Sequence, residues 1–138
     1  MTDYRENCLT CEEYNSLRRS VGWKQLCEAQ ASEAISRSVL VVTAVRCGRT
    51  VAMGRLVGDG VYYLITDVAV VPELQGQGIG GRIVDILLSY AESRTPAGGS
   101  ASVQLIAERG REEFYLKKGF ASVPNSISGA GMQRIIRK

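Results

Sequence analysis

The residues best suited to ligand chemistry lie in segment 67–82, where an apolar strand pattern passes into a glycine-rich turn and then a helical pattern. The turn, residues 75–81, contains four glycines, which let a backbone approach a ligand without obstruction by side chains. A helix that begins inside such a turn directs unpaired N–H groups and the positive end of its dipole into one space. This arrangement suits a phosphate or pyrophosphate. The predicted chemistry of the turn is therefore recognition of an anion, not bond-making.

Two other phosphate-binding loops compete for the same residues. A P-loop ends in Lys-Ser or Lys-Thr, which Gly81-Arg82-Ile83 does not supply. A dinucleotide fingerprint, G-x-G-x-x-G, matches Gly76–Gly81 loosely, but it should follow the first strand of a βαβ unit. Here the turn follows strands that hairpins connect. Glu108 does end the next expected strand, so the dinucleotide alternative stays open.

The elements before the turn are predicted from caps and turn residues. Thr10-x-x-Glu13 has the form of a capping box, which opens a helix that reaches about Ser20. A second helix is expected over Lys24–Ser36. Three antiparallel strands follow, joined by tight turns at Cys47-Gly48-Arg49 and Gly58-Asp59-Gly60. These strands are Val39–Arg46, Thr50–Val57 and Val61–Val71.

The elements after the turn complete a mixed sheet. Apolar residues at helical spacing predict an amphipathic helix over Gly78–Ser93. A strand, a short helix and a closing pair of strands should follow, over Ala101–Ala107, Arg111–Lys118, Phe120–Val123 and Met132–Ile136. The expected fold is a single α/β domain, residues 1–138, with a mixed, mostly antiparallel central sheet flanked by helices.

Composition narrows the functional class. The chain has 138 residues, 45% of them apolar and 22% charged, as in an average soluble protein. It has no apolar run long enough for a bilayer and no leader at its start, so we expect a cytoplasmic protein without a membrane partner. The net charge of +3 is mild and its basic residues are scattered. This pattern argues against a nucleic-acid partner.

The four cysteines include one C-x-x-C pair, Cys8 and Cys11. A structural zinc site needs four ligands, yet the chain has no histidine and Cys27 and Cys47 lie far apart. A redox role would require a strand before the pair and a helix that opens at it. We therefore expect free thiols in a reducing compartment and no metal.

The turn and its context resemble a known family. Gln75-x-x-Gly78-x-Gly80, directly after the strand that ends at Pro72, is similar to the acetyl-CoA signature [Q/R]-x-x-G-x-[G/A] of the GNAT superfamily of N-acetyltransferases. Phe114–Phe120 resembles the second signature of that family, a helical tyrosine shortly before Gly-Phe. Segments 17–23 and 53–60 also look like those of its compact, single-domain branch, so the similarity covers almost the whole chain.

The resemblance implies how the cofactor binds. The backbone amides of Gln75, Gly76, Gln77, Gly78, Ile79, Gly80 and Gly81 would hold the pyrophosphate of acetyl-CoA. Val68, Ala69 and Val70 would offer strand-edge groups to the pantetheine arm. In the family, the fourth and fifth strands splay apart at a bulge, which we expect near Thr66–Val68.

The resemblance also implies direct transfer of an acetyl group to a primary amine of a small molecule. Tyr115 matches the tyrosine that protonates the departing sulfur, and a backbone N–H near Val70 would polarise the thioester. The identity of the general base is left undecided. Some relatives carry a carboxylate or histidine at the positions of Leu64 and Thr66, and neither of these residues is suited to that role. Strand alternation turns Asp67 to the opposite face. We expect Asp67 to pin a loop, with proton transfer by Asp67, Glu108 or a water chain as alternatives.

Two alternatives to this function remain. The missing base leaves room for a regulatory module that binds acyl-CoA without turnover. The acceptor could instead be a peptide or protein amine. Because members of the family often form dimers, a homodimer is one expected oligomeric state.

Overall fold

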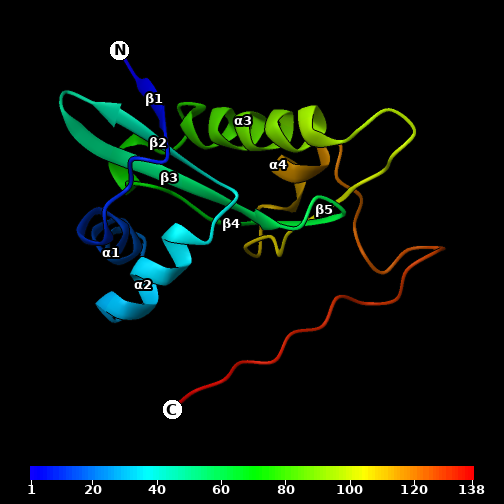
Figure 1. Cartoon of the computed structure of the whole chain (residues 1–138). Coiled ribbons are helices and arrows are strands. Elements are labelled where there is room, and N and C mark those ends of the chain that lie inside the picture. Colours follow the sequence, from blue (N-terminus) through cyan, green and yellow to red (C-terminus); the bar gives the residue numbers. More distant parts are fainter. The chain divides into compact units, whose positions relative to one another are not determined.

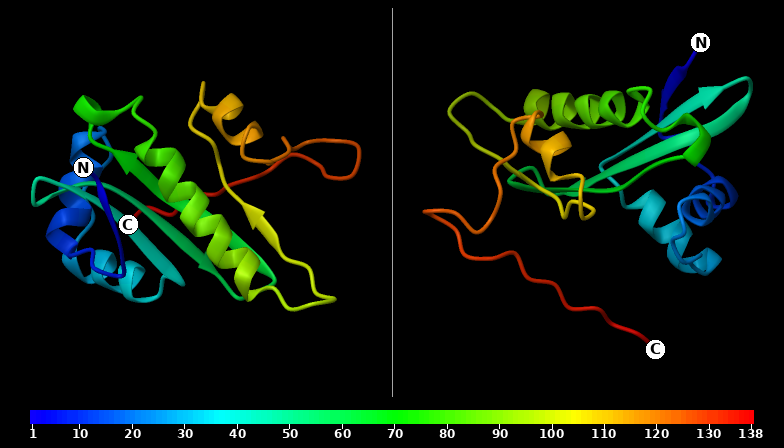
Figure 2. Two further views of the ribbon diagram at one scale, coloured as in Figure 1. Left: turned by 90° about the horizontal axis from the view of Figure 1, so that it is seen from above. Right: turned by 180° about the vertical axis from the view of Figure 1, so that it is seen from behind.

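The computed structural model describes all residues of the chain, Met1–Lys138, and divides them into two compact units, Met1–Leu105 and Ile106–Lys138. The first unit is a five-stranded sheet in the order β1-β2-β3-β4-β5, with α3 across one face and α1 and α2 on the other (Figures 1 and 2). Its elements are β1 (Asp3–Glu6), α1 (Cys11–Ser20), α2 (Glu28–Ser36), β2 (Leu40–Arg46), β3 (Arg49–Gly58), β4 (Tyr62–Val70), the 3-10 helix η1 (Pro72–Leu74), α3 (Ile79–Arg94) and β5 (Ser102–Gln104). The second unit contains α4 (Glu112–Leu116).

The sheet has the mixed, mostly antiparallel form that the sequence predicts. β1 to β4 pair antiparallel, and β5 pairs parallel with β4. Both predicted hairpins form. Residues of the first turn adopt left-handed backbone angles, and a side chain of the second turn accepts hydrogen bonds from backbone N–H groups. Cys47 and Gly48 have φ values of 51° and 72°, and the Asp59 carboxylate accepts the N–H groups of Val61 and Tyr62 at 2.9 Å. The α/β fold class is therefore confirmed.

One part of the core lies between the sheet and α3, and another lies beneath α1 and α2 through Tyr14, Leu17 and Ala31. One face of α3 is buried, through Ile79, Ile83, Val84, Leu87 and Ala91. Gly54 in β3 lets this helix approach, because a Cβ atom at Gly54 would lie 2.5 Å from Cγ2 of Ile83. None of the helices is both long and apolar enough to cross a membrane.

Two elements near the start of the chain differ from prediction. β1 was not expected, because an exposed edge strand of polar residues carries no alternating apolar pattern. α2 begins at Glu28 instead of Lys24. The Asn15 side chain donates to the Leu26 carbonyl at 2.9 Å and accepts the Leu26 N–H at 3.0 Å. These bonds take the backbone groups that a longer helix would need.

The predicted closing strands, Phe120–Val123 and Met132–Ile136, are wrong, since the second unit contains no strand. In this segment, hydrogen bonds between residues close in the sequence take the place of hydrogen bonds between strands. The Phe120 N–H donates to the Tyr115 carbonyl and so ends α4. The Asn125 side chain accepts two following N–H groups at 2.9 Å, which forms a turn.

The first helix begins with the predicted capping box, and this cap is tied to the sheet. Thr10 Oγ1 accepts the Glu13 N–H, and Glu13 Oε1 accepts the Thr10 N–H, both at 3.1 Å. The other Glu13 oxygen accepts a hydrogen bond from the Thr50 hydroxyl of β3. Partial burial opposes ionisation of Glu13, but the hydrogen bonds from Thr50 and Thr10 outweigh burial and hold the pKa of this carboxyl below its usual value.

Acidification should therefore weaken the fold through Glu13. A lowered pKa in the folded state contributes stability above the unfolded value of about 4.3, and this contribution is lost as the pH falls through the folded value. Replacement Glu13→Gln should remove about 1 kcal/mol near neutral pH. It should also flatten the dependence of the melting temperature on pH below about 5. Thermal unfolding checks this against Glu12→Gln on the same helix turn. If the melting temperature depended on pH in the same way in both variants, the role of Glu13 would be contradicted.

Candidate active site

The predicted anion-binding turn lies between β4 and α3. β4 passes through η1 into residues 75–78, and α3 begins at Ile79. Gly76 and Gly78 have φ values of 81° and 83°, a region that L-residues rarely adopt. A Cβ atom at either glycine would meet nothing within 4 Å. Backbone conformation and not crowding therefore requires glycine at these two positions.

Six consecutive N–H groups of this turn, those of residues 76–81, have no acceptor within the chain. They stand at the positive end of α3, a helix of 16 residues. The Gln75 N–H differs, because it donates to the Pro72 carbonyl at 3.3 Å. A cluster of unpaired N–H groups around glycines fits a phosphate or pyrophosphate group. The residues present thus fit the predicted ligand.

Side chains of the turn brace it against the sheet. Gln75 Nε2 donates to the Val70 carbonyl at 2.9 Å. Arg46 Nη1, at the end of β2, donates to Gln77 Oε1 at 3.1 Å. These two amide side chains are therefore occupied by protein partners, which leaves the backbone as the donor surface of the turn.

β4 carries the predicted bulge directly before this turn. Arg55 of β3 pairs with Thr66, whereas Met53 pairs with Ala69, so two residues of β4 lie opposite Gly54. One of them, Asp67, has a φ of 54°, which costs a non-glycine residue about 1–2 kcal/mol. The bulge expected near Thr66–Val68 is therefore confirmed.

The bulge lies beside a free strand edge. Pairing between β4 and β5 ends at Leu64 and Gln104, so the rest of β4 has β3 as its one strand neighbour. The Val71 N–H donates to Val51 of β3. Because successive residues of a strand point their backbone groups to opposite sides, those of Val70 and Val68 face the free edge. Those of Ala69 face β3.

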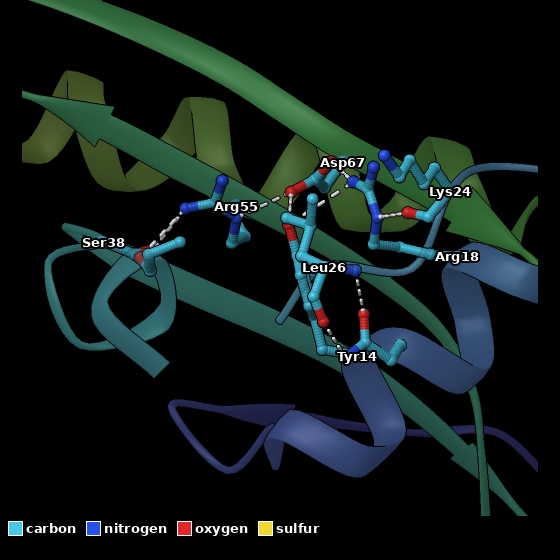
Figure 3. Close-up of polar contacts among 9 residues, drawn as sticks. Tyr14, Arg18, Lys24, Leu26, Ser38, Arg55 and Asp67 are labelled. Atoms are coloured by element: carbon cyan, nitrogen blue, oxygen red, sulfur yellow. Dashed lines mark hydrogen bonds and ion pairs between the residues drawn. The ribbon is translucent and has the colours of Figure 1, made fainter. Parts of the chain in front are cut away.

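Asp67 lies in a cluster of charged side chains on the α1 and α2 face of the sheet (Figure 3). Its carboxylate accepts from the Tyr14 hydroxyl at 2.6 Å, Arg55 Nε at 2.9 Å and Arg18 Nη1 at 3.0 Å. The side chains of Asp67 and Arg55 are each 11% exposed. Burial, together with the hydrogen bond to Asp67, raises the pKa of Tyr14. Tyr14 therefore stays protonated and donates.

This cluster corrects the expectation that Asp67 pins a neighbouring loop. The bulge turns Asp67 toward α1, which lies far from it in the sequence, and toward Arg55 of the neighbouring strand β3. Sequence reasoning did not find Tyr14, Arg18 and Arg55 as its partners. A signal was present in Arg55, a cation inside the apolar run of β3 that requires a buried counter-charge.

The two other candidate residues, Tyr115 and Glu108, lie in the second unit. Glu108 is exposed. It does not lie at the end of β5 as predicted, because that strand ends at Gln104 instead of Ala107. Tyr115 packs in α4 between Phe114 and Phe120, with ring centroids 5.0 and 5.9 Å away. Burial raises the pKa of Tyr115, so this hydroxyl keeps its proton at neutral pH.

No group of three or more histidine, cysteine, aspartate or glutamate side chains is arranged to hold a metal ion. All four cysteines are free, and the Cys8 thiol donates to the Glu6 carbonyl at 3.1 Å.

Comparison with known proteins agrees with the fold. A sequence model described as an acetyltransferase (GNAT) domain matches residues 10–135. The chain is 30% identical over 125 residues to serotonin N-acetyltransferase 2, chloroplastic, of Oryza sativa subsp. japonica. The match covers 87% of this chain and 60% of the rice protein, so the chain spans less than two thirds of that relative.

Solved structures share the fold. A probable acetyltransferase of meticillin-resistant Staphylococcus aureus is 29% identical with a TM-score of 0.85, and the match covers 98% of this chain and 100% of that one. A GNAT-family acetyltransferase of Streptococcus pneumoniae is 27% identical with a TM-score of 0.81, over 100% of both chains. The chain belongs to the GNAT family of acetyltransferases.

Proposed function

We propose that the protein is an N-acetyltransferase that moves an acetyl group from acetyl-CoA directly to a primary amine of a small molecule. The observation that carries this proposal is the row of N–H groups at residues 76–81, which lack acceptors and lie next to the free edge of β4. The membership of the GNAT family supports the reaction class.

Acetyl-CoA would be held along β4 and its turn. The N–H groups of Gly76, Gln77, Gly78, Ile79, Gly80 and Gly81 would donate to the pyrophosphate, while Gln75 braces the turn through Val70. In segment 68–70, Val68 would donate and accept along the pantetheine arm, and the Val70 N–H would donate to it, since the Val70 carbonyl already accepts from Gln75. Ala69 would keep the strand paired to β3. When bound, acetyl-CoA supplies an activated acetyl thioester.

The chain's residues would act on the transfer by orientation and by moving one proton. In the reaction, the amine nitrogen forms a bond to the acetyl carbon, the carbon–sulfur bond breaks, and the amine passes a proton through water to the solvent. The Val70 N–H would polarise the thioester oxygen. Tyr115 would give its proton to the departing thiolate, a role that suits a hydroxyl kept neutral by burial.

The acceptor amine would enter on the α1 and α2 face of β4. On this strand Tyr62 is 64% exposed and Leu64 is 41% exposed. An aromatic and an aliphatic side chain here favour an amine with an apolar body. The name of the rice relative, a serotonin N-acetyltransferase, points the same way. The free cysteines suit a reducing compartment such as the cytoplasm.

Acetyl-CoA should raise the melting temperature of the protein. A ligand that binds only the folded state at 100 times its dissociation constant adds about 2.7 kcal/mol to the free energy of unfolding. For a domain of this size that is a shift of several degrees, on the order of 5–10 °C. Differential scanning fluorimetry with acetyl-CoA, and with adenosine as the control ligand, checks the result. No shift at millimolar acetyl-CoA would contradict the proposal.

Release of free thiol from acetyl-CoA with a panel of amines then separates the candidate functions. Steady release with a small arylalkylamine or alkylamine supports the enzyme. Release that requires a peptide amine would instead indicate a protein N-acetyltransferase. Binding without turnover across the panel would indicate a regulatory module that holds acyl-CoA.

A further inference from the structure

Asp67 combines an unusual backbone conformation with an unusually complete set of partners. It is one of three non-glycine residues with a positive φ, at 54°. Three donors hold its carboxylate, and they come from α1 and β3 (Figure 3). A residue keeps such a strained backbone conformation only where interactions with its neighbours hold it there. The three donors supply that constraint at the bulge.

The donors are themselves fixed in place. Arg18 Nε donates to the Lys24 carbonyl at 2.8 Å. Arg55 Nη1 donates to the Ala34 carbonyl at 3.0 Å and to Ser38 Oγ at 2.9 Å. Arg18 also lies over the rings of Tyr14 and Trp23, each with a centroid 5.6 Å away. The cluster therefore ties α1, α2 and β3 to one point of β4.

That point decides the orientation of the groups that follow it. A bulge re-aims the strand beyond it, and the next backbone groups to face the free edge of β4 are those of Val68 and Val70. Without the bulge, alternation along β4 would turn Asp67 to the α3 face and Val68 to the opposite one. Val68 instead lies on the α3 side, where a Cβ atom at Gly54 would meet it at 3.5 Å alongside Ile83 and Leu87.

We propose that Asp67 is a positioning residue, held by Tyr14, Arg18 and Arg55, which sets the bulge so that the Val68 and Val70 N–H groups are aimed at the thioester arm of the cofactor. This inference rests on the proposed function. It also assigns Asp67 no part in proton transfer, because a carboxylate that accepts two guanidinium N–H groups and a phenol, and is 11% exposed, is poorly placed to take a proton from an amine.

Replacement Asp67→Asn keeps the size of the side chain and tolerates a positive φ, but it removes the charge that both arginines pair with. The value of kcat should fall about 10- to 100-fold, as expected for a small misplacement of a reacting group. The KM for acetyl-CoA should change less than about 3-fold, because residues 76–81 are untouched. The shape of the pH–rate profile should persist.

Two further variants separate positioning from folding. Tyr14→Phe keeps the buried ring and removes one donor, so kcat should fall by a smaller factor, about 3- to 10-fold. Arg37→Gln is the control. It also removes an arginine–carboxylate ion pair, the exposed Arg37–Glu33 pair at the end of α2, and should leave kcat unchanged. In ¹⁵N–¹H spectra, the Val68 and Val70 amide signals should move in both cluster variants, while those of residues 76–81 stay.

Loss of one limb of the pH–rate profile in Asp67→Asn would show that Asp67 is a base and would overturn the inference. Unchanged kcat, or unmoved Val68 and Val70 signals, in a folded Tyr14→Phe protein would overturn it too. If the unmodified protein neither binds acetyl-CoA nor releases thiol, the proposed function fails instead. The amide spectra, which need no turnover, would then still decide whether the cluster sets the bulge.

Discussion

Replacement of Gly78 by valine is expected to raise the KM for acetyl-CoA at least about 100-fold. Gly78 has a φ of 83°, which a β-branched residue adopts only at high cost. The turn must therefore change shape, and the N–H groups on either side of Gly78 would no longer converge. Loss of two hydrogen bonds to a charged ligand, each about 1.5–3 kcal/mol, supports a change of this size. Steady-state kinetics over a range of acetyl-CoA concentrations checks it.

Gly98 offers a matched control for the strain itself. It has a φ of 80° and, like Gly78, open space around the position of a Cβ atom. It lies after α3, outside the turn that precedes that helix. Gly98→Val should therefore lower the melting temperature to a similar extent and leave KM unchanged. Equal increases of KM in the two variants would show that the effect on Gly78 is loss of stability, not loss of the anion site.

Removal of the Tyr115 hydroxyl should have the second large effect, on kcat. Tyr115→Phe keeps the ring that packs against Phe114 and Phe120, so the second unit should remain folded. Without a proton donor, the sulfur would leave as an unprotonated thiolate. General acid catalysis contributes about 10²–10⁴-fold, and we expect a fall of at least about 100-fold in kcat with little change in KM. Single-turnover assays of thiol release measure the chemical step.

The pH dependence gives this prediction a second test. Because burial raises the pKa of Tyr115, the acid form should persist above the usual tyrosine value of about 10. The activity limb that depends on Tyr115 should therefore lie at higher pH than that value and vanish in Tyr115→Phe. Tyr4→Phe, on the edge strand β1, is the control and should retain this limb. A Tyr115→Phe enzyme with full activity would rule out the acid role.

Local signals made much of the site predictable from the sequence. The glycine turn 75–81 follows a strand pattern and begins a helix, and each of these features depends on neighbouring residues. The hairpins at Cys47 and Asp59 and the capping box at Thr10 are local in the same way. The structure reproduces all of them. Short-range hydrogen bonds and backbone preferences therefore fixed this part in advance.

Long-range partners account for what the sequence did not show. Asp67 meets Tyr14 across 53 positions and Arg18 across 49, and no local pattern pairs such residues. The bulge at Asp67 also reversed the face that strand alternation assigns to it. The closing strands were wrong for a related reason, because an apolar run specifies a strand only if a partner edge completes its ladder.

The most direct test of the central claim is a crystal structure of the protein in complex with coenzyme A. The proposed function predicts pyrophosphate oxygens within about 2.7–3.2 Å of several backbone nitrogens of residues 76–81, with the pantetheine arm alongside Val68 and Val70. A coenzyme A molecule bound elsewhere, with those nitrogens bonded to protein atoms, would contradict it.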